Sequence, residues 1–245
     1  MSGLLEGKRA VVTGARGGIG KAILQSFVEE GAEAWACVRS ANSAFLEYVD
    51  DLILSHSAKV HILEFDLLDD SAVKAAAKCL RHDAKNINIL VNCAGVFPKS
   101  NSFSMTSMNE IIDTINANLI GSMRFTQYLL RFIDNGSSII NLSSIAAKGV
   151  SPGQYAYSCS KAAINVWTKM LADELGAKDI RVNAIAPGII DTAMTEMINP
   201  MAKQEKINET ALKRIGLPIE VASVAVFLAS SLSSYISGQI IEVNG

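Results

Sequence analysis

The sequence has little of what would mark it for export, for membrane insertion or for binding to nucleic acid. Its 245 residues hold only 4 cysteines and 5 prolines, and 22 Lys and Arg nearly balance 24 Asp and Glu. We find neither a run of about 18 apolar residues nor a basic, apolar, cleavable leader, so we expect no membrane span and no secretion. The net charge of −2 gives no reason to expect nucleic acid or an anionic membrane as partner. We therefore expect an ordered, cytoplasmic protein.

The cysteines form no metal-binding or disulfide pattern. Cys37, Cys79, Cys93 and Cys159 include no C-x-x-C pair, and the three histidines have no ligand-like spacing with them. Neither a metal site nor a disulfide framework is predicted. We expect each cysteine to be a small, buried apolar residue in a reducing compartment.

A glycine-rich turn lies between a short apolar run and a helical pattern near the amino terminus. Residues 8–13, KRAVVT, suit a buried strand, and a helical pattern follows from Lys21 to Glu30. Glycines let the backbone approach a pyrophosphate, whose charge is favoured at a helix amino terminus. This order of elements predicts a dinucleotide site. The residues expected at it are Gly14, Gly18, Ile19 and Gly20.

The second predicted strand, Glu33 to Val38, ends without an acidic residue. A carboxylate at this place would accept hydrogen bonds from the ribose hydroxyls of NAD. Arg39 stands there instead, and Arg16 lies in the glycine turn, so two guanidinium groups suit a 2′-phosphate. The pattern favours NADP(H) over NAD. The alternative is that both arginines are solvated loop residues.

Alternating strand and helix patterns continue to the end of the chain. We predict helices over 41–55, 70–83, 107–133, 153–177 and 218–230, helical turns within 192–213, and further strands over 59–65, 87–92, 138–142, 180–186 and 239–243. Strict alternation calls for a parallel sheet with helices on both faces. The sequence therefore predicts an α/β fold: one doubly wound, seven-stranded, Rossmann-like domain over residues 1–245.

Polar and small residues follow several of these strands, where ligands of such folds bind. They are Asp66 after the third strand, Asn92, Ala94 and Gly95 at the fourth, Ser144 at the fifth, and Pro187 and Gly188 at the sixth. Asn118 lies inside a predicted helix, where asparagine has poor propensity, so it marks either a functional site or a kink.

Tyr157 and Lys161 are four residues apart, and if the segment after Pro152 is helical they share one face. A phenol with a reference pKa of about 10 exchanges protons poorly at neutral pH. A neighbouring ammonium would lower the pKa of Tyr157, and Ser144 could hydrogen-bond the same reacting oxygen. Alone, such a pair also arises by chance, with Lys161 an ordinary solvated lysine.

Together these motifs resemble the short-chain dehydrogenase/reductase family over residues 5 to the end. The motifs are Thr13-Gly14-x3-Gly18-x-Gly20, Asp66, Asn92-x-Ala94-Gly95, Asn118, Ser144, Tyr157-x3-Lys161 and Pro187-Gly188. Within the family, the chain is most similar to the bacterial 3-oxoacyl-[acyl-carrier-protein] reductases, notably over residues 212–218 and 237–245.

The resemblance implies a role for each residue. Tyr157 would be the catalytic acid or base, Lys161 would lower its pKa and hold the nicotinamide ribose, Ser144 would orient the carbonyl, and Asn118 would anchor a proton-relaying water. The glycine turn would line the pyrophosphate, Asp66 the adenine, and Asn92 the adenosine side of the cleft. Pro187 to Ile190, with Thr192, would hold the carboxamide.

The resemblance also implies an NADPH-dependent reduction of a carbonyl, with a 3-oxoacyl thioester on an acyl carrier as substrate, and a homotetramer assembled through helices 107–133 and 153–177 and the last strand. We expect residues 189–217 to form a substrate lid with an apolar wall that includes Met194, Met197 and Met201.

The sequence departs from the family pattern at two places, which weakens the expected phosphate contact of the arginine and the expected docking of an acidic carrier. Arg16-Gly17 replaces the usual Ser-Arg, and the expected basic turn after the long helix reads Ile133-Asp134-Asn135. Two alternatives remain: a family member acting on a free ketone, sugar or alicyclic alcohol, and a nucleotide-binding regulator without chemistry.

Overall fold

Seven parallel strands form a single sheet in the computed structural model, which describes residues 3–149, 153–196 and 198–245. The strand order is β3-β2-β1-β4-β5-β6-β7, so the chain winds outward in both directions from the central pair β1 and β4. The strands are β1 (Arg9–Thr13), β2 (Glu33–Val38), β3 (Val60–Glu64), β4 (Ile87–Asn92), β5 (Ile133–Leu142), β6 (Arg181–Pro187) and β7 (Ile240–Val243). The predicted doubly wound, Rossmann-like sheet is confirmed. Pro152 and Met197 lie outside the described residues.

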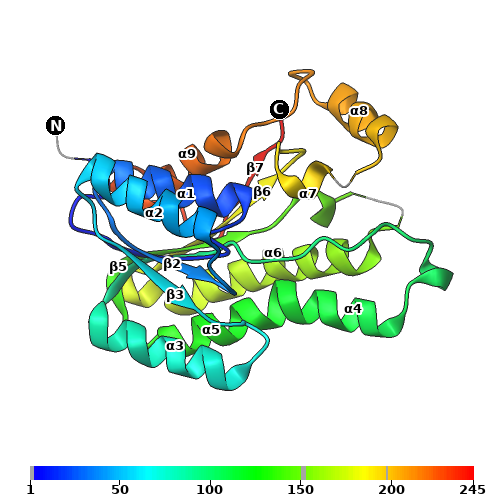
Figure 1. Ribbon diagram of the computed structural model, residues 1–245. Helices are drawn as coiled ribbons and strands as arrows, with labels where there is room; N and C mark the ends of the chain where they lie inside the picture. The colour runs from blue at the N-terminus through cyan, green and yellow to red at the C-terminus, as the bar shows by residue number, and fades with distance from the viewer. Residues whose placement is uncertain (1–2, 150–152, 197) are drawn as a thin grey trace.

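Helices cover both faces of the sheet, as Figure 1 shows. One layer holds α1 (Gly18–Glu29), α2 (Ser43–His56) and α9 (Pro218–Ala229). The other holds α3 (Asp70–Asp83), α4 (Met108–Ile115), α5 (Gly121–Leu129) and α6 (Tyr155–Leu175). Because helices pack above and below it, the sheet is buried on both faces and its central strands are almost continuously apolar.

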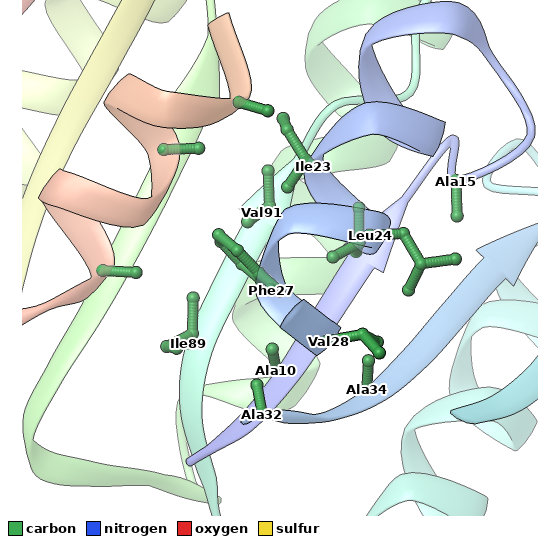
Figure 2. Close-up of a cluster of buried hydrophobic side chains, with 14 of the residues drawn as sticks. Ala10, Ala15, Ile23, Leu24, Phe27, Val28, Ala32, Ala34, Ile89 and Val91 are labelled. Atoms are coloured by element: carbon green, nitrogen blue, oxygen red, sulfur yellow. The ribbon is translucent and has the colours of Figure 1, made fainter. Parts of the chain in front are cut away.

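The core between α1 and the sheet shows why this helix docks where it does. Ile23, Leu24, Phe27 and Val28 recur at helical spacing, and Figure 2 shows them pointing at strand residues that include Ala10. Phe27 is fully buried, which stabilises the fold by about 2–3 kcal/mol. This packing fixes the amino end of α1, and therefore the glycine turn, against β1.

Strand β5 begins earlier than predicted. Ile133 pairs with Ile87, and the register then shifts before Ser138 pairs with Ile89. The sequence predicts a turn over 133–135, but these residues belong to the irregular start of the strand. Gly136, with φ of +78°, lets the chain resume a regular ladder after the shift. Residues 133–135 show no apolar alternation, which is why the prediction misses the early start.

The long helix predicted over 107–133 is not continuous. A π-helical turn, Asn116–Ile120, separates α4 from α5. Such a turn inserts one extra residue and is frequent at functional sites. It contains Asn118, whose place inside a predicted helix indicates either a kink or a functional site.

The described residues between β6 and α9 include two short helices. They are α7 (Ala193–Glu196) and α8 (Pro200–Glu209). The two ends of this excursion are joined, because Asp191 N donates to Gly216 O at 2.8 Å and Gly216 N donates to Ile189 O at 3.0 Å. None of the helices in the described parts of the chain has the length and apolarity needed to cross a bilayer.

Candidate active site

A cleft of about 820 Å³ opens along the carboxyl ends of the central strands. It collects residues from the glycine turn, from the ends of β2, β4, β5 and β6, and from α6 and α7. All but two of the predicted site residues line it. The lining set is Gly14, Arg16, Gly18, Ile19, Gly20, Arg39, Asp66, Ala94, Gly95, Ser144, Tyr157, Lys161, Pro187, Gly188, Ile190 and Thr192. Asn92 and Asn118 lie outside this lining.

Two glycines of the turn, Gly14 and Gly18, have no room for a side chain. Gly14 has φ of +66°, and a Cβ there would come within 2.8 Å of Ala94 Cα. A Cβ on Gly18 would come within 2.6 Å of Thr192 Cγ2. Among the described residues no side chain caps the first turn of α1, so its N–H groups are available to an anion. A bare backbone cradle at a helix amino terminus fits a pyrophosphate.

Two arginines stand at the end of the cleft beside β2. Arg16 and Arg39 are both exposed, and Arg16 Nη1 donates to the carbonyl oxygen of Ser40 at 2.8 Å. This bond draws Arg16 toward the residue that follows Arg39. Both arginines line the cleft where β2 ends, and the 2′-phosphate contact predicted for them stays a prediction.

Ser144, Tyr157 and Lys161 meet at the opposite end. Ser144 caps a short 3₁₀ turn directly after β5, and its Oγ accepts a hydrogen bond from Ala146 N at 3.2 Å. Tyr157 and Lys161 lie one turn apart on α6, with Lys161 Nζ 5.7 Å from the Tyr157 ring centroid. The spacing prediction is confirmed for this pair, because both side chains reach the same cleft.

The pKa of Tyr157 differs in direction from the prediction. Burial raises the pKa of the Tyr157 phenol, and a hydrogen bond from Ser144 only partly opposes this. Burial also lowers the pKa of Lys161 to about 8. The net shift of the Tyr157 pKa is therefore opposite to the predicted lowering, because burial disfavours the charged phenolate.

Asn118 joins the cleft wall to α6 from below. It is fully buried; its Oδ1 accepts from Val96 N at 2.7 Å, and its Nδ2 donates to Val96 O at 3.0 Å and to Ser160 Oγ at 3.1 Å. These bonds fix the loop after β4. Asn118 therefore supports the site from the π-helical turn through three hydrogen bonds to two residues, and its predicted water stays a prediction.

Asn92 is predicted on the adenosine side of the cleft, and its side chain does not lie there. It is buried beneath the cleft, with Nδ2 donating to Thr126 Oγ1 and to Asn141 Oδ1, each at 2.9 Å. As the last residue of β4 it points its side chain into the helix layer. Thr13, the last residue of β1, contacts the loop beyond β4. Its Oγ1 accepts hydrogen bonds from the backbone N–H groups of Cys93 and Ala94.

The cysteines are not all buried as predicted. Cys37 is buried, but Cys79 and Cys159 are exposed on α3 and α6, and Cys93 lines the cleft. Burial raises the pKa of the Cys93 thiol to about 12, so it stays protonated near Lys161. Within the described ranges no group of histidine, cysteine and acidic side chains is arranged to hold a metal ion.

Phe97 is missed by the sequence prediction. Its ring stands edge-on to Tyr157, with centroids 4.8 Å apart and an interplanar angle of 78°. It lies two residues after Gly95, in a loop at the carboxyl end of a parallel strand. That position alone could have marked it, because such loops carry ligand contacts in doubly wound folds.

A doubly wound sheet with a glycine cradle at one end of a cleft and a Ser-Tyr-Lys group at the other defines a dinucleotide-dependent oxidoreductase. The family model described as enoyl-(acyl carrier protein) reductase matches residues 14–245. The chain belongs to the short-chain dehydrogenase/reductase family, whose members use a nicotinamide cofactor.

Similar proteins cover at least 98% of the chain. The 3-oxoacyl-[acyl-carrier-protein] reductase FabG of Chlamydia trachomatis is 37% identical over 249 residues, with 100% of this chain and 99% of that protein covered. A 3-oxoacyl-[acyl-carrier protein] reductase of Brucella melitensis, solved with bound NAD, is 31% identical with a TM-score of 0.87, covering 99% and 92%. A short-chain dehydrogenase of Burkholderia cenocepacia in complex with NADP is 28% identical with a TM-score of 0.92, covering 98% of each chain.

Proposed function

We propose that this oxidoreductase uses NADPH to reduce a ketone to a secondary alcohol, with 3-oxoacyl thioesters on an acyl carrier as its substrates. The observation that carries the proposal is the meeting of Ser144, Tyr157 and Lys161 at one end of a cleft whose other end holds a glycine cradle and two arginines. NADPH, when bound, supplies the hydride. The chain supplies position and a proton.

Tyr157 donates the proton to the carbonyl oxygen, which Ser144 holds by a second hydrogen bond. Because burial raises the pKa of Tyr157, the phenol is protonated at neutral pH and is ready to act as an acid. Once the proton has left, the Lys161 ammonium stabilises the phenolate. With a pKa of about 8, Lys161 is still mostly charged at neutral pH. We propose that a water held at Asn118 returns the proton.

The cofactor is held by residues along the rest of the cleft. Arg16 and Arg39 bind the 2′-phosphate and so select NADPH, and Asp66 contacts the adenine. The backbone from Pro187 to Ile190, with Thr192, holds the carboxamide. Thr192 also packs against Gly18, since a Cβ on Gly18 would collide with it. The segment 189–217 would then act as a lid, because its ends are joined at Gly216 while α7 borders the cleft.

The names of the FabG relatives support an acyl-carrier substrate. The start of β5 favours a second candidate, a family member acting on a free ketone, sugar or alicyclic alcohol. Residues 133–135 offer one acidic and no basic side chain where an acidic carrier would need positive charge. Arg124 does not supply this positive charge, because its guanidinium is paired with Asp70, with Nε 3.2 Å from Oδ1.

A homotetramer is also part of the proposal. Met108 and Ile112 on α4, and Val166 and Met170 on α6, expose large apolar side chains on the helices expected to pair between copies. Light scattering that finds only a monomer would contradict the proposed homotetramer.

Turnover assays separate the candidate functions. The full-length protein is mixed with NADPH and an acetoacetyl thioester, first as a small thioester and then on acyl carrier protein. NADPH oxidation with the carrier-bound substrate supports the first proposal. Oxidation only with free ketones or sugars supports the second candidate. NADPH binding without turnover of any carbonyl would mean a regulator that has kept the fold.

A further inference from the structure

Phe97 forms one wall of the cleft beside the residue proposed to donate the proton. The T-shaped contact with Tyr157, at 4.8 Å between centroids, is a favourable aromatic geometry. A carbonyl that accepts the Tyr157 proton must bring its flanking groups close to this phenol. The Phe97 ring, which also lines the cleft, is within reach of one of those groups.

The wall is held rigidly. Val96, the residue before Phe97, has both its backbone N–H and its carbonyl bonded to the buried Asn118 amide. Asn118 is in turn bonded to Ser160 on α6, the helix that carries Tyr157. The loop and the helix are therefore fixed to the same side chain, and the two rings keep their relative position.

The part of the cleft lining nearest Phe97 in the chain and the start of α7 carry apolar side chains, which are Val96, Ala193 and Met194. Among the described residues, the charged side chains of the lining are Arg16, Arg39, Asp66 and Lys161. The arginines stand beside β2, and the Lys161 ammonium donates to Leu142 O at 2.7 Å. No further cation of the described lining is available to a carboxylate carried by the substrate next to Phe97.

We infer that Phe97 determines substrate specificity: it binds the alkyl group on the ketone carbon, and it selects uncharged alkyl chains of several carbons over both a methyl group and a chain that ends in a carboxylate. The inference rests on the proposed ketone reduction and adds the chemistry of the substrate. It makes Phe97 a specificity residue rather than part of the proton path.

The test compares kcat/KM for acetoacetyl and 3-oxohexanoyl thioesters, which differ by two methylenes, in the full chain with saturating NADPH. The wild-type protein should prefer the longer chain, and F97A should lower that preference by about tenfold, the order expected for apolar discrimination in a pocket. F97L, which keeps an apolar side chain, should lie between the two. A thioester of similar length whose chain ends in a carboxylate should be at least about tenfold poorer in the wild-type protein.

The chain offers a matched control. Phe103 also packs edge-on against a tyrosine of α6, with its ring centroid 5.2 Å from that of Tyr155, but it is exposed and lies outside the cleft lining. F103A should leave the chain-length ratio unchanged. An effect of F103A as large as that of F97A would mean that the aromatic contacts act through the loop and not on the substrate.

Failure of the inference differs from failure of the proposed function. If the wild-type protein reduces no ketone, the proposed function fails. If it reduces ketones but F97A slows both thioesters equally, Phe97 only positions Tyr157 and the inference is overturned. Equal turnover of the carboxylate-ended and methyl-ended chains would overturn it as well.

Discussion

The Lys161 ammonium donates a hydrogen bond of 2.7 Å to the backbone carbonyl oxygen of Leu142, the last residue of β5. This bond joins α6 to the sheet directly under the cleft. It gives a buried lysine one fixed partner and holds its charge near Tyr157. The same burial lowers the pKa of Lys161, so the placement of this lysine beside Tyr157 is linked to the stability of the fold.

Lys161 should make the cofactor-free protein more stable as the pH rises. Its pKa is about 8 when folded, against 10.5 for an ordinary lysine, so between these values the unfolded chain binds more protons. From about pH 7.5 to about pH 9.5 this adds about 2 kcal/mol to the free energy of unfolding. Urea denaturation of K161M should lack this gain, whereas K169M, which changes an exposed lysine of the same helix, should keep it. The same pH dependence in K161M and wild type would contradict the account.

Arg39 should discriminate between the two nicotinamide cofactors. R39A should weaken NADPH binding by about ten- to a hundredfold, because a charge-assisted hydrogen bond to phosphate is worth about 1.5–3 kcal/mol. NADH binding should change by less than about twofold. Calorimetric titration measures both, and R131A, outside the cleft, serves as control. Equal losses for the two cofactors would refute the 2′-phosphate assignment.

Gly18 and Gly17 provide a paired test of the glycine cradle. A Cβ on Gly18 would come within 2.6 Å of Thr192 Cγ2, whereas on Gly17 the nearest atom, Gly14 O, is 3.4 Å away. Overpacking of this size costs about 1–3 kcal/mol, so G18A should weaken NADPH by about tenfold or more. G17A should weaken it much less. Comparable cofactor affinity in both variants would show that contact with Thr192 does not shape the site.

Much of the framework is predictable because local patterns and the sheet agree. Strictly alternating strands and helices predict one doubly wound parallel sheet. Residues at the carboxyl ends of its strands, such as Ser144 and Pro187, have to meet at one edge of that sheet. The four-residue spacing of Tyr157 and Lys161 is enough by itself to place both side chains on one face of α6.

The predictions that failed depend on contacts between residues that lie far apart in the sequence. The side chain of Asn92 points to a buried partner, Asn141, that no local pattern reveals. The early start of β5 depends on pairing between Ile133 and Ile87. The direction of the Tyr157 pKa shift depends on how deeply the folded chain buries the phenol, and spacing along a helix cannot supply that.

The most direct test of the central claim is the rate of ketone reduction by Y157F. If Tyr157 donates the proton, kcat should fall by about a thousandfold, while the NADPH dissociation constant stays within about twofold of the wild-type value. Y155F, which removes the hydroxyl of an exposed tyrosine two residues away, should keep full activity. A Y157F protein that still reduces the ketone at more than about a tenth of the wild-type rate would contradict the account.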